Sequence, residues 1–426
     1  MNRRAAILGG NRIPFARSNK QYAHASNQDM LTSALDGLVA RFGLAGKRLG
    51  EVAGGAVLKH SKDINLTRES VLGSALSPTT PAFDIGQACA TGLEACVSIS
   101  QKIRLGQIES GIAGGADTTS DAPIVVSDGL RENLLALSRA RTIPQKLQAI
   151  ARIRPQDLAP VAPSTAEART GLSMGEHQAR TTAHWGITRQ AQDELALASH
   201  TNMAAAWDRG FFDDLVTPYL GVTRDTNLRA DSTMESLAKL NPVFGRNLEA
   251  EATMTAGNST PLTDGASTVL LGSEEFAAEL GIEPLAYLVD AEAAAVDFVE
   301  GEEGLLMAPA YAVPRLLARN GLTFDDIDVF EIHEAFASTV LCHLAAWESE
   351  EFCTQKLGLD APLGAVDRAK LNPNGSSLAA GHPFAATGGR IVAQTAKHLK
   401  ETGQKRALIS ICAAGGQGVA AIVEAD

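Results

Sequence analysis

The sequence is poor in cysteine and in long apolar runs. Its 426 residues contain five cysteines, an odd number with no C-x-x-C pair, which disfavours both a disulfide framework and a structural zinc site. Free thiols are typical of a reducing compartment. No apolar stretch is long enough to span a bilayer, and the apolar run after Arg3 and Arg4 is too short for a secretory signal. We therefore expect a cytoplasmic protein.

Positive charge is also in deficit. There are 37 lysines and arginines against 49 aspartates and glutamates, and the formal net charge of −12 disfavours general nucleic-acid binding. With 45% hydrophobic and 20% charged residues the chain can bury a sizeable core, and its length suits two or three domains. Apolar strands alternate with alanine-rich helices, which predicts an α/β fold.

Two parts of the sequence repeat one order of features. Each contains an opening apolar strand, a second strand, an A-T-G triplet that opens a helix, and a strand that runs into glycines. The paired segments are 5–8 and 285–289, 52–58 and 329–332, 90–92 and 386–388, and 111–117 and 410–418. We interpret this order as the duplication of one βαβ-rich unit.

Residues 118–247 fit neither repeat, because their pattern is helical, irregular and interrupted by prolines. We predict that they form a loop domain inserted into an N-terminal half, which consists of residues 1–117 and 248–282. Residues 283–426 form the C-terminal half. The N-terminal half resumes with turn signals that precede a predicted strand at 267–271.

Cys89 lies in the stretch QACATGLEA (87–95), directly before apolar residues at helical spacing. The start of a helix offers free N–H groups and the positive end of the helix dipole, which lower the pKa of a thiol. Cys89 is therefore a candidate nucleophile. On this stretch alone a small buried side chain is the better interpretation, and three further stretches favour catalysis.

These stretches place three reactive residues at strand ends or helix starts, where α/β sheets form their ligand sites. His333 follows a strand in EIHEAFAST, His382 lies in the glycine-rich AAGHPFAATGGR, and Cys412 lies on the last predicted strand. A neutral histidine can take a thiol proton, a second thiol can shuttle a proton, and glycines let backbone N–H groups approach an oxyanion. Each residue alone also fits a structural role in a cap, a loop or the core.

Together the four stretches resemble the thiolase family. QACATGLEA resembles its nucleophile segment, HEAFA its N-E-A-F-A segment with His333 in place of asparagine, GHPFAATG its G-H-P-x-G-x-T-G loop, and CAAGGQG its C-x-G-G-G-x-G ending. TAGNSTPLTDGA is similar to the turn that lines the coenzyme A tunnel. The likeness spans essentially the whole chain, and HEAFA is similar to the long-chain branch, the β subunits of fatty-acid oxidation trifunctional complexes. Departures from the usual spelling are Thr91, Ala385 and the pair Ala413-Ala414.

The resemblance implies a duplicated αβαβα layered fold of two five-stranded halves, with the inserted domain covering the coenzyme. It also implies thiolysis of a 3-ketoacyl-CoA by CoA in fatty-acid β-oxidation. In that reaction Cys89 attacks the 3-keto carbon after His382 takes its proton, and Cys412 protonates the enolate and then deprotonates the incoming thiol. His382 and a water held by His333 form one oxyanion hole, and the backbone N–H groups of Cys89 and Ala414 form a second.

Ligands and partners also follow from the resemblance. CoA is a substrate, and neither a metal nor a redox cofactor is expected. Matching family positions assign Met174 to the substrate tunnel and four residues to the CoA site: Arg229, Ser236, Ala256 and Thr260. A homodimer or a dimer of dimers is expected, and an enoyl-CoA hydratase/3-hydroxyacyl-CoA dehydrogenase subunit is a possible further partner.

Three alternatives remain open. A decarboxylating ketoacyl synthase shares the fold but lacks a second catalytic cysteine, so Cys412 disfavours it. An acetoacetyl-CoA thiolase working in the synthetic direction would carry the same residues and would differ only in chain length and direction. A non-catalytic CoA-binding scaffold would not need the set of Cys89, His333, His382 and Cys412.

Residues 131–154 form a basic amphipathic segment. Six basic residues and one acid give it a charge of +5 in a chain of net −12, and four isoleucines and leucines share a helical face: Ile143, Leu147, Ile150 and Ile153. A solvated helix face and the binding of CoA phosphates by arginine are two interpretations. The third is docking to a partner subunit or to an anionic membrane surface, which the resemblance favours.

Overall fold

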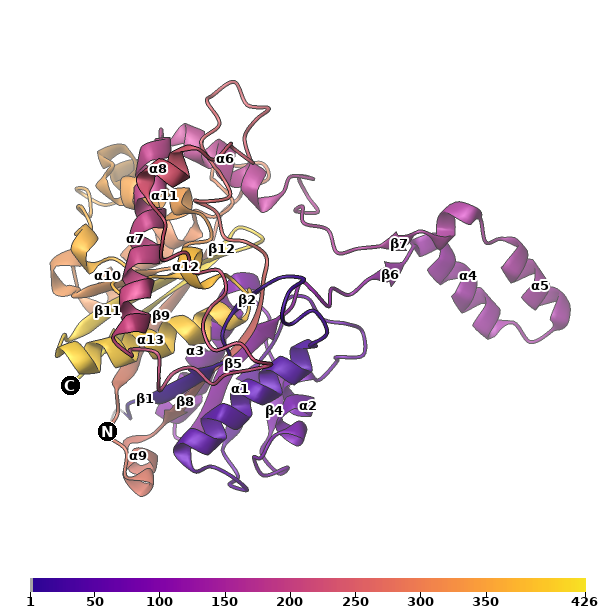
Figure 1. Cartoon of the computed structure of the whole chain (residues 1–426), viewed down its shortest axis with the longest axis horizontal. Helices are drawn as coiled ribbons and strands as arrows, with labels where there is room; N and C mark the ends of the chain where they lie inside the picture. The colour runs from indigo at the N-terminus through magenta and orange to yellow at the C-terminus, as the bar shows by residue number, and fades with distance from the viewer. Residues whose placement is uncertain (1–2) are drawn as a thin grey trace.

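The computed structural model describes residues 3–426 and is organised around one large, mixed β-sheet (Figure 1). The strands lie in the order β10-β11-β12-β9-β1-β8-β5-β3-β4, and β2 (Ala16–Arg17) pairs with the start of β8. Their bounds are β1 Ala6–Arg12, β3 Glu51–Gly54, β4 Ala82–Asp84, β5 Ser110–Asp117, β8 Thr263–Gly272, β9 Ala286–Ala295, β10 Val329–Ile332, β11 Arg406–Ala413 and β12 Gln417–Glu424. The predicted α/β class is confirmed.

The two sides of this sheet repeat the same pairing. β8 lies antiparallel between β1 and β5, and β3 runs parallel to β5. On the other side β12 lies antiparallel between β9 and β11, and β10 runs parallel to β11. Within residues 3–426 the two sides of the sheet pair where Ala6 and Ile7 of β1 meet Tyr287 and Ala286 of β9. The duplication inferred from the order of features is therefore present in the topology.

The C-terminal half has four described strands, and the expectation of a fifth is wrong. A single parallel bridge between Phe330 and Leu371 stands where β4 lies in the other half. Strand pairing does not continue past Leu371, because Asn372 has a φ of 46° and Pro373 offers no N–H to a neighbouring strand.

Helices cover the sheet in layers. α1 (Asn27–Phe42) and α2 (Leu66–Gly73) cover the outer face of the N-terminal half, and α10 (Ala308–Asn320) and α11 (Ala337–Glu348) cover that of the C-terminal half. Between the halves, α3 (Thr91–Arg104) and α13 (Ala386–Thr402) lie together in a common apolar core. A short helix, α9 (Glu274–Leu280), precedes β9, and no helix in residues 3–426 is long and apolar enough to cross a membrane.

The two central helices meet backbone to backbone near their first turns. A Cβ on Gly92 would lie 2.5 Å from the carbonyl oxygen of Ala385, and a Cβ on Gly388 would lie 2.1 Å from the nitrogen of Leu93. Both distances are shorter than any side chain allows, so the glycine of each A-T-G triplet is required for this contact. The contact brings the starts of α3 and α13 to one place at the centre of the molecule.

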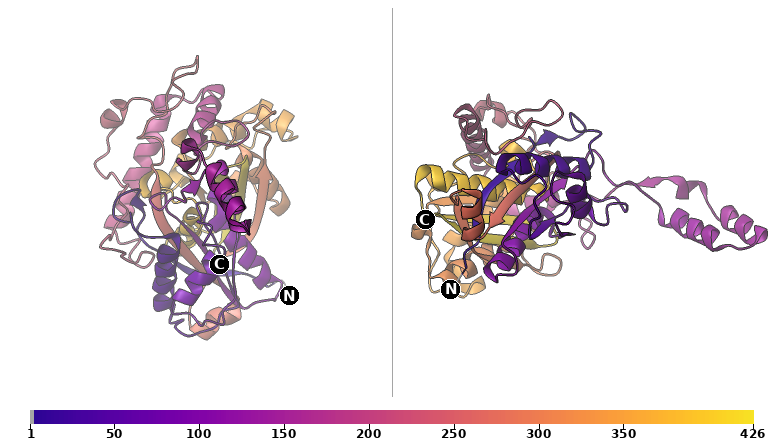
Figure 2. Two further views of the ribbon diagram at one scale, coloured as in Figure 1. Left: turned by 90° about the vertical axis from the view of Figure 1, so that its right-hand side faces the viewer. Right: turned by 90° about the horizontal axis from the view of Figure 1, so that it is seen from below.

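The segment inserted between β5 and β8 has two parts. β6 (Val125–Val126), α4 (Asp128–Arg139), α5 (Ile143–Ala151), a 3₁₀ turn and β7 (Pro160–Val161) form an arm, residues 122–162, that projects from the body (Figures 1 and 2). The basic segment is thus two helices and a turn, because the Thr142 hydroxyl caps a new helix that carries Pro144 in its first turn. α6 (Met174–His184), α7 (Arg189–Asp208) and α8 (Met234–Ala238) lie on the body, where α7 packs against α11 and α12 (Ser377–Ala380).

Candidate active site

Cys89 lies in a tight 3₁₀ turn, Ala88–Ala90, that leads directly into α3. Ala88 has a φ of 46°, a left-handed conformation that is uncommon for any residue other than glycine. The Thr91 hydroxyl stabilises the turn, because it accepts the N–H of Gln87 at 2.9 Å and donates to the Ala88 carbonyl at 2.8 Å. Cys89 is buried, with 9% of its surface exposed, and its predicted position at a helix start is confirmed.

The thiol of Cys89 is protonated in the resting protein. Burial raises its pKa to about 12, and hydrogen bonds from the N–H groups of Ala414 and of Cys89 itself offset this only in part. The prediction that the helix start lowers this pKa is wrong, because loss of solvation of the thiolate outweighs the helix dipole. Both N–H groups nevertheless lower the pKa of the thiol, which is the polarity that an oxyanion hole around an acylated Cys89 would need.

His333 and His382 lie beside each other, with ring centroids 4.1 Å apart. His333 directly follows β10, and its N–H donates to the Ser410 carbonyl of β11 at 2.9 Å, whereas His382 lies in the loop between α12 and α13. Each Nδ1 contacts a hydroxyl at 2.7 Å, that of Ser377 for His333 and that of Thr387 for His382. Both Nε2 atoms are buried without a hydrogen-bond partner among the described residues, so they are free to act on a substrate.

Burial keeps both imidazoles neutral. It lowers the pKa of His382 to about 3, with a further contribution from Arg390, and it lowers the pKa of His333 well below its usual range, with contributions from His382 and Arg390. A neutral imidazole with a free nitrogen can accept a proton from a thiol. Either imidazole can therefore serve as a proton acceptor at its Nε2 atom.

Cys412 lies near the end of β11, opposite Gly418 of β12. The prediction that Cys412 lies on the last strand is wrong. Gly415 and Gly416, with φ of 78° and 71°, reverse the chain after β11, and β12 follows as the last strand. The side chain is 2% exposed, and burial raises the pKa of its thiol, with a smaller contribution from nearby Cys89. The site therefore holds two protonated thiols.

Met174, at the start of α6, packs on the apolar cluster around Cys412, together with Phe298 and Phe336. Thr260 donates both its N–H and its hydroxyl to the carbonyl of Ala335, at 3.1 and 2.9 Å. Met174 thus lies in the apolar cluster that contains Cys412, and Thr260 is bonded to a residue two positions along the chain from His333.

The other three predicted CoA residues lie further out, on the surface. Ala256 is exposed in a turn whose next residue, Gly257, lies against α8. The exposed Ser236 belongs to the capping box of α8, and the N–H of Arg229 donates to Nδ1 of His200 at 3.2 Å. Their contact with CoA, and that of Thr260, stays a prediction.

Two buried carboxyl groups brace the site and were missed in the sequence. Asp117, at the end of β5, accepts the N–H groups of Leu58 at 2.8 Å and Ala385 at 2.9 Å, and burial raises its pKa to about 6. It thereby ties the His382 loop to the N-terminal half. Glu334 accepts Asn372 Nδ2 and the Ser199 hydroxyl, both at 2.7 Å. In the sequence, Asp117 is marked only as the residue that ends GIAGGAD, and Glu334 only as the second residue of HEAFA.

A third missed residue, Glu167, joins the active site to the inserted segment. Its Oε1 accepts the N–H of Gly415 at 3.0 Å, directly beside Ala414. Glu167 lies between the arm and α6, in a stretch without a recognisable motif. The turn that carries the Ala414 N–H is thus held by a residue that follows the arm.

Comparison with known proteins agrees with this geometry. The family models described as Thiolase, N-terminal domain and Thiolase, C-terminal domain match residues 5–275 and 282–425. The 3-ketoacyl-CoA thiolases of Yersinia enterocolitica and Vibrio cholerae are each 41% identical over 429 residues, which cover 99% of this chain and 97% of each relative.

Solved structures show the same likeness. Human mitochondrial 3-ketoacyl-CoA thiolase superimposes with a TM-score of 0.80 at 26% identity, covering 100% of this chain and 99% of that one. The Bacillus anthracis acetyl-CoA acetyltransferase gives a TM-score of 0.82 at 28% identity and covers both chains completely. A structure of the human protein in complex with CoA is similar as well, with a TM-score of 0.80.

Proposed function

The chain belongs to the thiolase family, and from that premise we propose that it is an acyltransferase that cleaves 3-ketoacyl-CoA with CoA, using Cys89 as nucleophile. The products are acetyl-CoA and an acyl-CoA shortened by two carbons, as fatty-acid β-oxidation requires. The observation that most supports this proposal is the pair of buried histidines, His333 and His382, whose ring centroids lie 4.1 Å apart and whose Nε2 atoms have no hydrogen-bond partner among the described residues. CoA enters as a substrate.

In the first half-reaction Cys89 attacks the 3-keto carbon while Nε2 of His382 takes its proton. The bond between the second and third carbons then breaks, which leaves the acyl group on Cys89 and the electron pair on the enolate of acetyl-CoA. The Nε2 atoms of His382, now protonated, and of His333 would donate to the enolate oxygen, which the proximity of the two rings supports. Cys412 supplies the proton that converts the enolate carbon into the methyl group of acetyl-CoA.

In the second half-reaction the Cys412 thiolate takes the proton of the incoming CoA thiol. The CoA sulfur attacks the acyl carbon on Cys89, and the N–H groups of Cys89 and Ala414 stabilise the oxyanion. Cys89 leaves and recovers its proton from His382. The same residues would catalyse acetoacetyl-CoA synthesis in reverse, and the likeness to an acetyl-CoA acetyltransferase supports this as the second candidate function.

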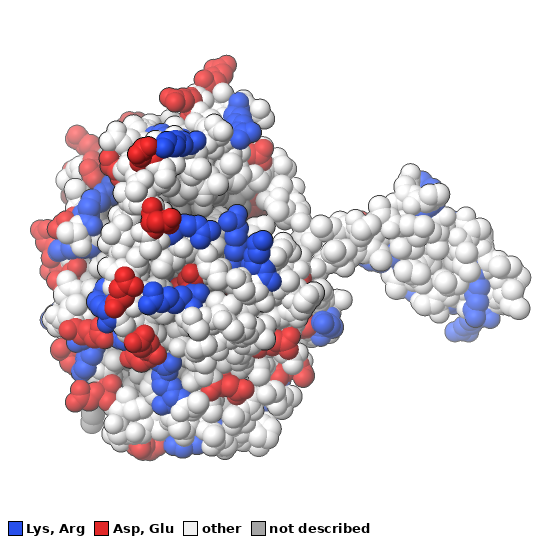
Figure 3. All heavy atoms as spheres, in the orientation of Figure 1, with Lys and Arg blue, Asp and Glu red and all other residues white. Residues whose placement is uncertain are grey.

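For the arm we propose a role in association. Its apolar residues are exposed, with Ile143 at 74% and Leu147 at 62%, and its visible face in Figure 3 is mostly white with blue patches. The arm projects away from the body that holds Cys89 (Figure 1), which disfavours binding of CoA phosphates in the same chain. A hydratase–dehydrogenase subunit or an anionic membrane surface would match its charge and its apolar face, and the catalytic body would assemble as a homodimer or a dimer of dimers.

Thiolysis rates measured on a series from acetoacetyl-CoA to 3-ketohexadecanoyl-CoA test the proposed reaction. Cleavage of the longer substrates, with acetyl-CoA released in equal amount, is the expected result. Activity confined to acetoacetyl-CoA would favour the synthetic enzyme. Binding of CoA without cleavage of any member of the series would overturn the proposed reaction and favour a scaffold.

A further inference from the structure

Three buried polar side chains form a hydrogen-bonded series that ends at His333 in the proposed catalytic centre. Arg390 of α13 donates from Nη2 to the Ser377 hydroxyl at 3.0 Å, and that hydroxyl contacts Nδ1 of His333 at 2.7 Å. None of the three residues is more than 2% exposed. Ser377 opens α12, so three separate segments contribute one residue each.

The direction of each hydrogen bond in this series follows from the chemistry of its members. Arginine can only donate, and a serine hydroxyl carries a single proton. Because the Ser377 oxygen accepts from Arg390, its proton is free for Nδ1 of His333, which is the only acceptor that it reaches among the described residues. The opposite direction would leave a buried hydroxyl proton without an acceptor, which is rare and unfavourable in folded proteins.

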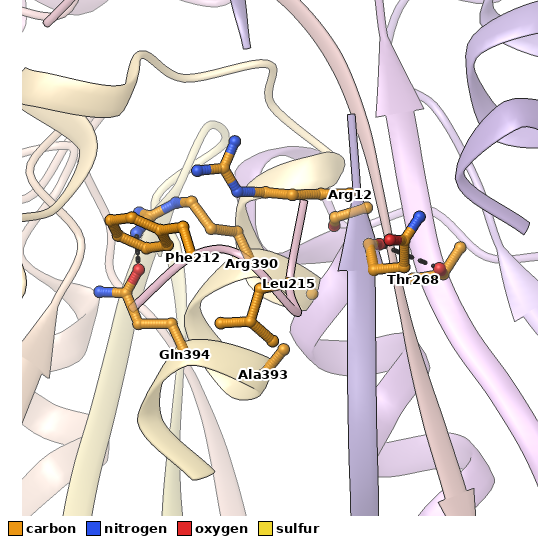
Figure 4. Close-up of a pocket in the computed structure, with 10 residues that line it drawn as sticks. Arg12, Phe212, Leu215, Thr268, Arg390, Ala393 and Gln394 are labelled. Carbon is orange, nitrogen blue, oxygen red and sulfur yellow. Dashed lines mark hydrogen bonds between the residues drawn. The ribbon is translucent and has the colours of Figure 1, made fainter. Parts of the chain in front are cut away.

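Arg390 is itself held firmly as a donor. Nη1 bonds to Oε1 of Gln394 at 3.2 Å and lies 3.8 Å from the carboxylate of Glu331, and Nη2 also reaches the Ser376 hydroxyl at 3.2 Å. Figure 4 shows Arg390 and Gln394 on the wall of a small cavity behind the site, below Arg12. The other arginine of this cavity, Arg12, bonds to both carboxylate oxygens of Asp225. The two arginines therefore do not share a carboxylate partner.

We propose that Arg390 and Ser377 are positioning residues that hold His333 in the tautomer with its proton on Nε2. His333 then presents a fixed hydrogen-bond donor beside Nε2 of His382, directed at the enolate oxygen or at a water bound to it. This catalytic consequence rests on the thiolysis proposed above, whereas the tautomer itself does not.

The two histidines differ in how their Nδ1 atoms are held. The Thr387 hydroxyl contacts Nδ1 of His382 at 2.7 Å, but no arginine donates to that hydroxyl among the described residues. The hydroxyl can therefore either donate to Nδ1 or accept a hydrogen bond from it, and the second arrangement gives the Nε2 lone pair that a base needs. The tautomer of His333 is thus fixed by its neighbours, whereas His382 can exchange its proton between its two nitrogens.

The direct test is nitrogen NMR of protein labelled in its histidine rings, with His333 assigned by its loss in His333→Asn. Wild type should show His333 protonated at Nε2 and bare at Nδ1, and Ser377→Ala should show a mixture of tautomers. A proton on Nδ1 in wild type would overturn the proposal. This measurement needs no substrate, so failure of the proposed reaction would leave it unaffected.

Kinetics provide the second test, with Ser376→Ala as a matched control. Ser376 is equally buried and also accepts from Arg390, but its hydroxyl donates to Glu331 at 3.0 Å and has no hydrogen bond to His333 among the described residues. Ser377→Ala should lower kcat by about tenfold, less than the loss of a whole oxyanion donor, with the KM for CoA unchanged. Ser377→Thr should retain the rate, and Ser377→Ala should have no further effect in a His333→Asn background. Equal losses of kcat in Ser376→Ala and Ser377→Ala would reduce the pair to a structural role.

Discussion

The catalytic centre and the arm are opposites in burial, charge and connection to the rest of the chain. At the centre Cys89, Cys412 and both histidines are at most 9% exposed and are held by hydrogen bonds from both halves of the sheet. On the arm Ile143 is 74% exposed, and α4 has no buried residue. Under the functions proposed above, chemistry and association would reside in separate parts of one chain. If so, each can be removed without loss of the other.

Cys89→Ala should have the largest effect on the centre and none on the arm. Turnover should be abolished because the proposed acyl carrier is lost and Cys412 is assigned to proton transfer, while CoA binding measured by calorimetry stays nearly intact. Mass spectrometry after incubation with substrate should find an acyl group on wild type only. An acyl group found elsewhere on the chain would contradict the assignment of the nucleophile.

Cys412→Ala should slow turnover roughly 10²–10⁴-fold, the usual loss when a positioned acid–base group is removed. Cys96→Ala is the control, since Cys96 is just as buried but lies within α3. Steady-state rates of both variants, with thermal stability measured in parallel, separate catalysis from packing. A Cys412→Ala enzyme with nearly wild-type kcat would return Cys412 to a packing role.

His333→Ala should slow cleavage roughly 10²–10³-fold, because one oxyanion donor is lost. His333→Asn offers a shorter donor and should recover part of the rate. His343, a buried histidine of α11 whose Nε2 contacts the Leu306 carbonyl at 2.7 Å, is the control position. If His333→Ala behaves like His343→Gln, with lower stability but a normal rate, then His333 is structural.

Acid should affect the centre less than the usual pKa of histidine, about 6.5, would suggest. The pKa of His382 is lowered to about 3 and that of Cys89 raised to about 12, so the base stays neutral above its lowered pKa and the thiol stays protonated below its raised one. The profile of kcat/KM for the 3-ketoacyl substrate should therefore be flat through the neutral range for these groups. A fall in kcat/KM below a pH of about 6.5 that disappears in a His382 variant would contradict this expectation. It would show that water solvates His382 in spite of its burial.

Neutralising the arm should have the smallest effect on the thiolysis rate. Arg139, Arg141, Lys146 and Arg152 form no ion pair among the described residues, whereas Arg131 and Arg154 pair with Asp128 and Asp157. Changing the first four to Gln should preserve thiolysis of a short soluble substrate. It should weaken binding to a hydratase–dehydrogenase partner or to anionic vesicles, and the wild-type binding should itself fall with salt. The double change of Arg131 and Arg154 to Gln is the control and should weaken binding less.

Two results would alter the comparison between centre and arm. A higher KM for CoA in the fourfold arm variant, with unchanged association, would assign these arginines to CoA phosphates and join the arm to the centre. No change in either property would leave the arm a solvated face.

Local sequence predicted the centre better than the arm. β10 matches the predicted strand 329–332, and both A-T-G triplets open or precede their helices as expected, because these features depend on neighbouring residues. The pKa of Cys89 could not be predicted, since its burial comes from segments far along the chain. The same holds for Ser377, which lies 44 positions from His333. The two-helix form of the arm did have local signals in Thr142 and Pro144 that periodicity alone overlooked.

The left-handed backbone at Ala88 has a cost in thermal stability. This conformation is unfavourable by roughly 1–2 kcal/mol for a residue with a Cβ, and glycine would avoid most of that strain. An alanine one position before the proposed nucleophile therefore gives up a small amount of thermal stability in exchange for a stiffer turn, and the turn that holds the sulfur is the place where this protein is less stable than its backbone would allow.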